Sequence, residues 1–89
     1  MPNPAPSPQE IVDRGRRYYA EHLRARLEPD HMDEYLVLDI DTGDYEVDPS
    51  ELAAFQRAYA RSPRGIFCIL RIGHRTAARL GGRLTRTPR

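Results

Sequence analysis

The first patterned segment of the chain predicts an amphipathic helix over residues 8–28. Its apolar and aromatic side chains recur at helical spacing and form one stripe. They are Ile11, Val12, Tyr18, Tyr19, Leu23 and Leu27. Ser7, Pro8 and Glu10 mark the start, because a serine cap, a proline at the first helical position and a glutamate three residues after the cap make a capping box. We expect Pro29 to end the helix.

Residues 34–48 predict a β-hairpin. Residues 34–41 are rich in strand formers, and the run Leu36–Leu38 is apolar on both faces, which suits a central strand. Residues 44–48 alternate acidic with apolar side chains, which is typical of an edge strand with one wet face. The Thr-Gly pair between the two segments suits a tight turn, with Gly43 at the position that takes positive φ.

A second helix is predicted to begin after Asp48, where an acidic cap, a proline and a glutamate give another start signal. Its expected buried stripe is Leu52, Phe55, Ala58 and Tyr59. Residues 66–72 then predict a third strand that ends at Gly73. Residues 76–80 are expected to form one or two helical turns, which two glycines close.

These elements predict an α+β fold in the order α-β-β-α-β, with a short C-terminal helix. If the third strand pairs with the first, the sheet has three strands in the order 2-1-3, and all neighbours are antiparallel. Both long helices would then cover one face, and the other face would show Arg71 and some acids. We expect one α+β domain over residues 7–82, a disordered proline-rich lead-in over 1–6 and a basic tail over 83–89.

Length and composition limit the class of protein. Eighty-nine residues make one domain with a thin core, so burial of a further apolar face in a homodimer is expected. The single Cys68 excludes an internal disulfide and a cysteine metal cluster. No apolar run approaches the length of a membrane span, and the N-terminus lacks the pattern of a signal peptide. These features predict a cytoplasmic protein without a membrane partner.

Charge is divided between the two parts of the chain. All fourteen basic residues are arginine. Residues 1–51 hold five of them with all thirteen acids, a net −8, and residues 52–89 hold the other nine with no acid, a net +9. Two interpretations stand side by side: the halves neutralise one another across the fold, or the basic half is reserved for an acidic partner. On the first helix, the charges are mixed and predict a solvent face formed by Asp13, Arg16, Arg17, Glu21 and Arg24.

Two short acidic motifs resemble catalytic ones. Asp39-Ile-Asp41 after a strand resembles the first motif of haloacid-dehalogenase-type phosphatases, but the chain has no lysine and no acid after Glu51. Asp41-Thr-Gly43 is the tripeptide of retroviral-type aspartic proteases, and these residue types are also those that a hairpin turn favours. The acids of the hairpin do not match the spacing of a calcium loop. The histidines and serines form no nucleophile–base set, so we predict no enzyme, no cofactor and no metal site.

The basic stretch after the third strand is the strongest binding signal. Arg71, Arg75, Arg79 and Arg83 recur every four residues, and His74 lies beside them. Such a row could meet phosphates, or it could pair with the acids of the hairpin. The candidate partner-binding residues are Arg71, His74, Arg75, Arg79, Arg83 and Tyr45.

The acidic run Leu38-Asp-Ile-Asp-Thr-Gly-Asp-Tyr-Glu-Val-Asp48 and the run Ile69-Leu-Arg-Ile-Gly-His-Arg-Thr-Ala-Ala-Arg-Leu-Gly-Gly82 resemble a group of short, uncharacterised bacterial proteins. These proteins share an acidic Thr-Gly hairpin and a final strand closed by an Arg-x-Gly sequence. The resemblance covers residues 10–82. It implies an accessory or antitoxin-like partner of another protein, with no established activity.

Together these observations predict a small, non-catalytic protein-interaction module that binds a protein partner or itself. The alternative is a nucleic-acid-binding regulator that acts through the arginine-rich C-terminal third.

Overall fold

The structure is a computed structural model that describes residues 6–74 and 78–82. Along the chain the elements are α1 (Pro8–Tyr18), the π-helical segment η1 (Tyr19–Leu23), α2 (Arg24–His31), β1 (Tyr35–Asp39), β2 (Tyr45–Asp48), α3 (Glu51–Arg61), β3 (Ile66–Arg71) and β4 (Ala78–Gly82). The predicted α+β class is confirmed. The predicted lead-in, except residue 6, and the predicted basic tail lie outside the described residues.

The four strands form one sheet in the order β2-β1-β3-β4, and every pair of neighbours is antiparallel. The predicted order 2-1-3 is therefore confirmed for the first three strands, and the predicted sheet lacks the fourth strand, β4, which pairs with β3. The predicted helical turns after β3 are wrong within the described residues, because 78–82 form β4. Pairing with β4 satisfies the backbone groups on the outer edge of β3, and two glycines disfavour a helix there.

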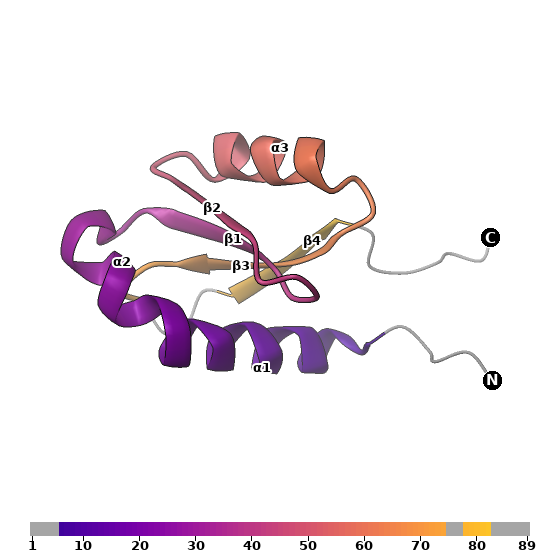
Figure 1. The fold of residues 1–89 in the computed structure, drawn as a ribbon, viewed down its shortest axis with the longest axis horizontal. Coiled ribbons are helices and arrows are strands. Elements are labelled where there is room, and N and C mark those ends of the chain that lie inside the picture. The colour runs from indigo at the N-terminus through magenta and orange to yellow at the C-terminus, as the bar shows by residue number, and fades with distance from the viewer. Residues whose placement is uncertain (1–5, 75–77, 83–89) are drawn as a thin grey trace.

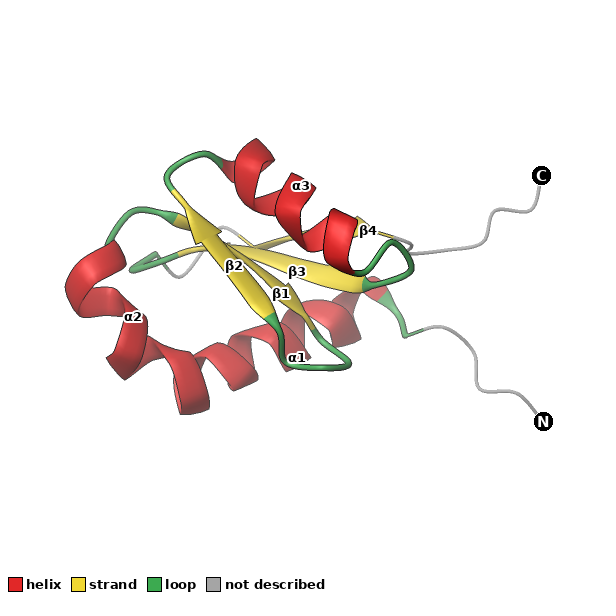
Figure 2. Ribbon diagram, turned by 45° about the horizontal axis from the view of Figure 1, so that its top comes forward, coloured by secondary structure: helices red, strands yellow, loops and turns green. Residues whose placement is uncertain are grey.

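The sheet lies between two helical layers. The run α1–η1–α2 covers one face, and α3 covers the other (Figures 1 and 2). The prediction that both long helices share one face, with Arg71 on an open face, is wrong. Since side chains alternate along a strand, Leu36 and Leu38 lie on the side of α1 while Val37 lies on the side of α3, and all three are fully buried. A strand that is apolar on both faces requires two covers.

The buried residues divide between the two faces of the sheet. The larger cluster lies between the sheet and α1–η1–α2 and consists of Ile11, Tyr19, Leu23, Leu27, Leu36, Leu38, Cys68, Leu70 and Ile72. The smaller cluster lies under α3 and consists of Val37, Ala54, Ala58, Phe67 and Ile69. The α1–η1–α2 run therefore makes the greater part of the core.

The N-terminal helical run begins as the sequence predicts and ends later. The Ser7 hydroxyl accepts from the Glu10 N–H at 3.1 Å, and the Glu10 carboxylate accepts from the Ser7 N–H at 2.7 Å, so the capping box is confirmed. Pro29 lies inside α2, which continues to His31. The expected end at Pro29 is wrong because, in the last turn, its missing N–H removes only one helical hydrogen bond.

The π-helical segment keeps one row of side chains on the sheet. The buried row Ile11, Gly15, Tyr19, Leu23 and Leu27 is spaced by four residues. In an α-helix such a row drifts by about 40° at each step. The wider turn, in which the Arg24 N–H donates to the Tyr19 carbonyl five residues back, turns the row in the opposite sense. The row thus stays buried from α1 to α2.

Helix α3 lies on the sheet through its small residues. Ala54 and Ala58 are buried, whereas Leu52 is 64% and Tyr59 49% exposed. The expected stripe is therefore wrong at Leu52 and Tyr59, which flank the contact. Alanine at the contact lets the helix approach β1 and β2 closely, so the larger side chains are displaced to its edge.

At Gly15, α1 lies close against β3. A Cβ atom added there would lie 2.6 Å from the Cys68 Cβ and would also meet the Cys68 Sγ. Burial raises the pKa of the Cys68 thiol to about 11, so it stays a neutral packing group. Glycine is required at this point for steric reasons, since Gly15 lies within a regular helix.

We expect Gly15→Ala to destabilise the protein by about 1–3 kcal/mol, because α1 must shift away from β3. Helix propensity alone predicts the opposite sign, a gain of about 1 kcal/mol. Urea unfolding measures the free energy of unfolding, and the exposed Ala60→Gly in α3 serves as a control, with an expected cost of about 0.5–1 kcal/mol. A more stable Gly15→Ala protein would show that the close approach is absent.

Candidate functional site: an arginine-lined cavity

Three acids of the hairpin, Asp41, Glu46 and Asp48, are paired with arginines of α1 and α3. Arg57 Nε lies 2.9 Å from Glu46 Oε1, and Arg57 Nη1 lies 3.1 Å from Asp48 Oδ2. Arg61 Nη1 lies 2.9 Å from Glu46 Oε2, and Arg14 forms a longer pair with Asp41. Among the residues that the structure describes, these three hairpin acids are thus paired without the basic stretch that follows β3.

The same two arginines of α3 protect the outer edge of β2. Arg57 Nη2 donates to the Val47 carbonyl at 2.9 Å, and Arg61 Nη2 donates to the Tyr45 carbonyl at 3.3 Å. These bonds occupy carbonyl groups that an edge strand would otherwise present to another chain. The Tyr45 side chain is half-buried against the larger core cluster, which gives this candidate partner-binding residue a packing role.

The acidic motif at the end of β1 is part of the turn. Asp39 is buried, and its Oδ1 accepts from the Asp41 N–H at 2.9 Å and the Thr42 N–H at 3.3 Å. Gly43 has φ 83°, as the turn interpretation expects. Within residues 6–74 and 78–82 no three His, Cys, Asp or Glu side chains gather to hold a metal ion, and no helix there is both long and apolar enough to span a bilayer.

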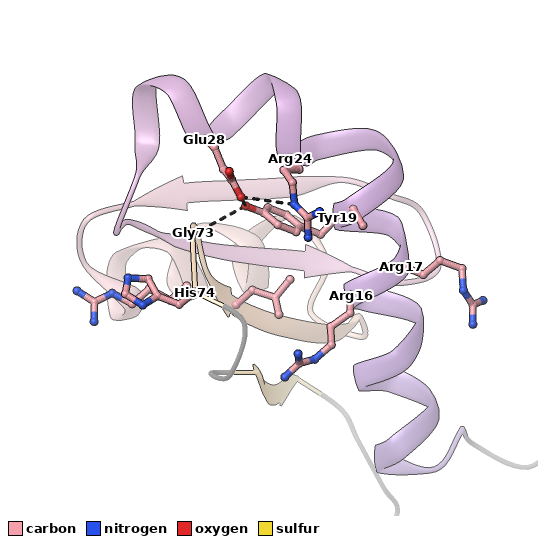
Figure 3. Close-up of a pocket in the computed structure, with 10 residues that line it drawn as sticks. Arg16, Arg17, Tyr19, Arg24, Glu28, Gly73 and His74 are labelled. Atoms are coloured by element: carbon pink, nitrogen blue, oxygen red, sulfur yellow. Dashed lines mark hydrogen bonds and ion pairs between the residues drawn. The ribbon is translucent and has the colours of Figure 1, made fainter.

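A cavity of about 660 Å³ lies between the N-terminal helical run and the end of β3 (Figure 3). It is lined by Arg16, Arg17, Tyr19, Ala20, Arg24, Glu28, Leu70, Arg71, Gly73 and His74. Within the part of the chain that the structure describes, the lining thus contains four arginines and one carboxylate, that of Glu28. This excess of positive charge in a concave surface favours an anion.

The helical wall of the cavity is a row spaced by four residues, formed by Arg16, Ala20, Arg24 and Glu28. This row lies beside the buried row Ile11–Leu27, and both rows continue through the π-helical segment. The small Ala20 leaves the space between the two arginines open. In Figure 3, Arg16 extends toward the sheet side of the helix, while Arg17 points away from it and lies at the rim.

Tyr19 joins the two walls of the cavity. Its hydroxyl donates to Glu28 Oε2 at 2.7 Å and accepts from the Gly73 N–H at 3.4 Å. Arg24 Nε lies 3.5 Å from Glu28 Oε2, and its guanidinium lies 5.5 Å from the centre of the Tyr19 ring. Burial, followed by the hydrogen bond to Glu28, raises the pKa of Tyr19, so this hydroxyl keeps its proton.

Arg71 and His74 form the opposite wall and are held by Asp33. Arg71 Nε donates to the Asp33 carbonyl at 3.2 Å, and its guanidinium lies 5.5 Å from the Tyr35 ring centre. His74 Nε2 lies 2.5 Å from Asp33 Oδ1. This hydrogen bond is the main reason that the pKa of Asp33 is lowered from its ordinary value of 3.8.

The structure brings together two of the six predicted binding residues, Arg71 and His74. Arg75 and Arg83 lie outside the described residues, as does the side chain of Arg79. The backbone of Arg79 belongs to β4 and pairs with Ile69 of β3. Sequence reasoning missed Arg16, Arg17 and Arg24, which it assigned to a solvent face. The sequence signal that could have found them is the spacing by four of Arg16, Ala20 and Arg24. Only the path of the helix in the structure shows that this row faces the cavity.

The comparisons with known proteins give no relative on which to base a function. No protein-family model matches the sequence, no curated protein matches it, and no solved structure matches the fold. The geometry of the cavity therefore carries the functional argument.

We expect the bond between His74 and Asp33 to make stability depend on pH in acid. Because the folded pKa of Asp33 is lowered, its contribution is present above about pH 3.8 and is lost as pH falls through the folded value. Asp33→Asn keeps a residue that tolerates the φ of 72° found here. Its urea midpoint should therefore fall less steeply than that of the wild type between about pH 5 and pH 3.

His74→Ala serves as the cross-check, since it removes the hydrogen-bond partner and leaves the carboxylate. It should flatten the acid profile, but less than Asp33→Asn does, because Arg71 still lowers the pKa of Asp33. Parallel profiles for the wild type and both variants would contradict the role given to this bond.

Proposed function

We propose that this chain is a non-catalytic interaction module and that its partner places an anionic group in the arginine-lined cavity. The observation that carries the proposal is that Arg16 and Arg24 of the N-terminal helical run line one cavity together with Arg71 and His74 from the end of β3. These residues are far apart in sequence, and one surface collects their charge. Paired arginine and anion oxygens form short, charge-assisted hydrogen bonds, which suit recognition more than reaction chemistry.

The hairpin acids Asp41, Glu46 and Asp48 pair with Arg14, Arg57 and Arg61, and none of these three arginines is among the described residues that line the cavity. Cys68 is buried with a raised pKa and is no nucleophile. Both facts favour a binding role over catalysis.

A nucleic-acid-binding regulator is the second candidate. The favouring observation is that Arg71 and His74 lie in the cavity wall directly before Arg75, Arg79 and Arg83 in a segment without acids. A phosphate backbone that entered the cavity could therefore continue along a basic chain. A protein partner with acidic or phosphorylated side chains would use the cavity alone.

The double variant Arg16→Gln/Arg24→Gln should weaken binding of an anionic probe about tenfold or more, because it removes two charge-assisted contacts. The probes are a labelled single-stranded DNA 12-mer and a labelled polyglutamate 12-mer, measured by fluorescence anisotropy. With the DNA, the slope of log K against log salt should decrease by about 1.4.

The matched control is Arg26→Gln/Arg64→Gln, which removes the same charge from two exposed arginines outside the cavity. It should leave both affinities within about twofold and thus show that position, rather than net charge, decides binding. Equal losses in the two double variants, or no binding of either probe, would contradict the proposal. Strong preference for DNA would favour the regulator.

Self-association stays a prediction from the short chain and its thin core. Light scattering at low and high salt measures the solution mass, and the ratio of absorbance at 260 and 280 nm reports bound nucleic acid. We expect a dimer at both salt concentrations. A monomer at both would contradict the expected homodimer without touching the role of the cavity.

A further inference from the structure

We propose that the ligand of the arginine-lined cavity is a phosphate ester that also carries hydroxyl groups. Arg16 and Arg24 hold the phosphate, and Glu28 accepts a hydrogen bond from a hydroxyl. This inference rests on the proposed function, because it names the chemical class of the anion that the cavity binds.

Glu28 is the residue that a site for a bare anion does not explain. Among the described residues that line the cavity it is the one carboxylate, and it lies beside Arg24. Its contacts with Tyr19 and Arg24 are both made by Oε2. A carboxylate accepts about four hydrogen bonds, so Glu28 retains capacity for a donor. A ligand with a donor uses this capacity, whereas a bare anion is repelled by the carboxylate.

Arg16 lies at a different place along the cavity from Glu28, whereas Arg24 lies beside Glu28. Figure 3 shows Glu28 and Tyr19 near Gly73 at one end and Arg16 further along the helix, with Arg24 reaching down beside Tyr19. A ligand that satisfies both ends must therefore be longer than a phosphate ion. The Tyr19 hydroxyl keeps its proton and donates a hydrogen bond to Glu28, which fixes the carboxylate in position.

The size and lining of the cavity agree with such a ligand. Its 660 Å³ lies within the range of about 300–1,000 Å³ that is typical of sites for organic ligands. Leu70 and Ala20 supply apolar surface between the charged groups. A cavity with this combination fits the carbon skeleton of a sugar phosphate or a nucleotide as well as its charged end.

Isothermal titration calorimetry on the full chain tests the inference with four ligands: pyrophosphate, ribose 5-phosphate, a ribonucleoside 5′-diphosphate and its 2′,3′-dideoxy counterpart. Glu28→Gln is the main variant, because glutamine keeps an acceptor for the Tyr19 hydroxyl. Ala20→Leu fills the cavity without a change of charge, and the exposed Ala60→Leu in α3 is its control. Urea unfolding verifies that each variant is folded.

Glu28→Gln should weaken the binding of the hydroxylated phosphates about tenfold, because their hydroxyl groups lose a charged acceptor. The same substitution should strengthen the binding of pyrophosphate roughly two- to fivefold, because a repulsive charge is removed. A comparison of two ligands on the wild-type protein avoids any effect of a substitution on folding. There the dideoxy ligand should bind about tenfold more weakly than the diphosphate with both hydroxyls. Ala20→Leu should abolish binding of all four ligands, and Ala60→Leu should change none.

Equal strengthening of all ligands by Glu28→Gln, together with equal affinity for the two nucleotides, would overturn this inference. The proposed function would survive that result, because the cavity would still bind anions. If the wild type bound no ligand, or if Ala20→Leu bound as the wild type does, the proposed function would fail as well. Tight ribose 5-phosphate binding identifies a sugar phosphate, and a marked preference for the diphosphate identifies a nucleotide.

Discussion

Burial of β1 on both faces is the constraint on which the architecture depends. The run Leu36–Leu38 offers apolar side chains to both sides of the sheet, and each side must be removed from water. One helical layer cannot do this, so α1–η1–α2 and α3 take opposite faces. The short chain is thereby distributed over three layers. Close approach is obtained with small residues, Gly15 against β3 and Ala54 and Ala58 against β1 and β2.

The same arrangement decides where charge is used. Placing α3 over β1 and β2 brings Arg57 and Arg61 to the acids and carbonyl groups of β2. Placing the N-terminal run over the other face brings its arginine row to the end of β3. The segregation of charge along the chain therefore has two outcomes in space. Three acids of the hairpin pair with arginines of α1 and α3, and a separate cavity lined by arginines forms around Tyr19 and Glu28.

The cavity depends on the π-helical segment as much as on its arginines. With regular α-helical turns, a row spaced by four residues would rotate away from the sheet within a few turns. The wide turn over Tyr19–Leu23 holds both the buried row and the Arg16–Glu28 row in place. Functional sites often occur at such irregular helical turns, and here the turn positions the residue that links the two walls.

Apart from the π-helical segment, the sequence by itself determined which segments up to β3 are helices and which are strands, the start of α1 and the hairpin turn, because caps, turn residues and periodicity are local signals. The order 2-1-3 was predicted only on the condition that β3 pairs with β1, and the sheet meets this condition. The sequence also pointed to Arg71 and His74. The tertiary structure alone decided which face α3 covers, that Leu52 and Tyr59 lie outside, that residues 78–82 pair as β4, and that Arg16 and Arg24 face a cavity. Each of these depends on which surfaces compete for burial and pairing once the sheet exists, and periodicity within one segment carries no information about that competition.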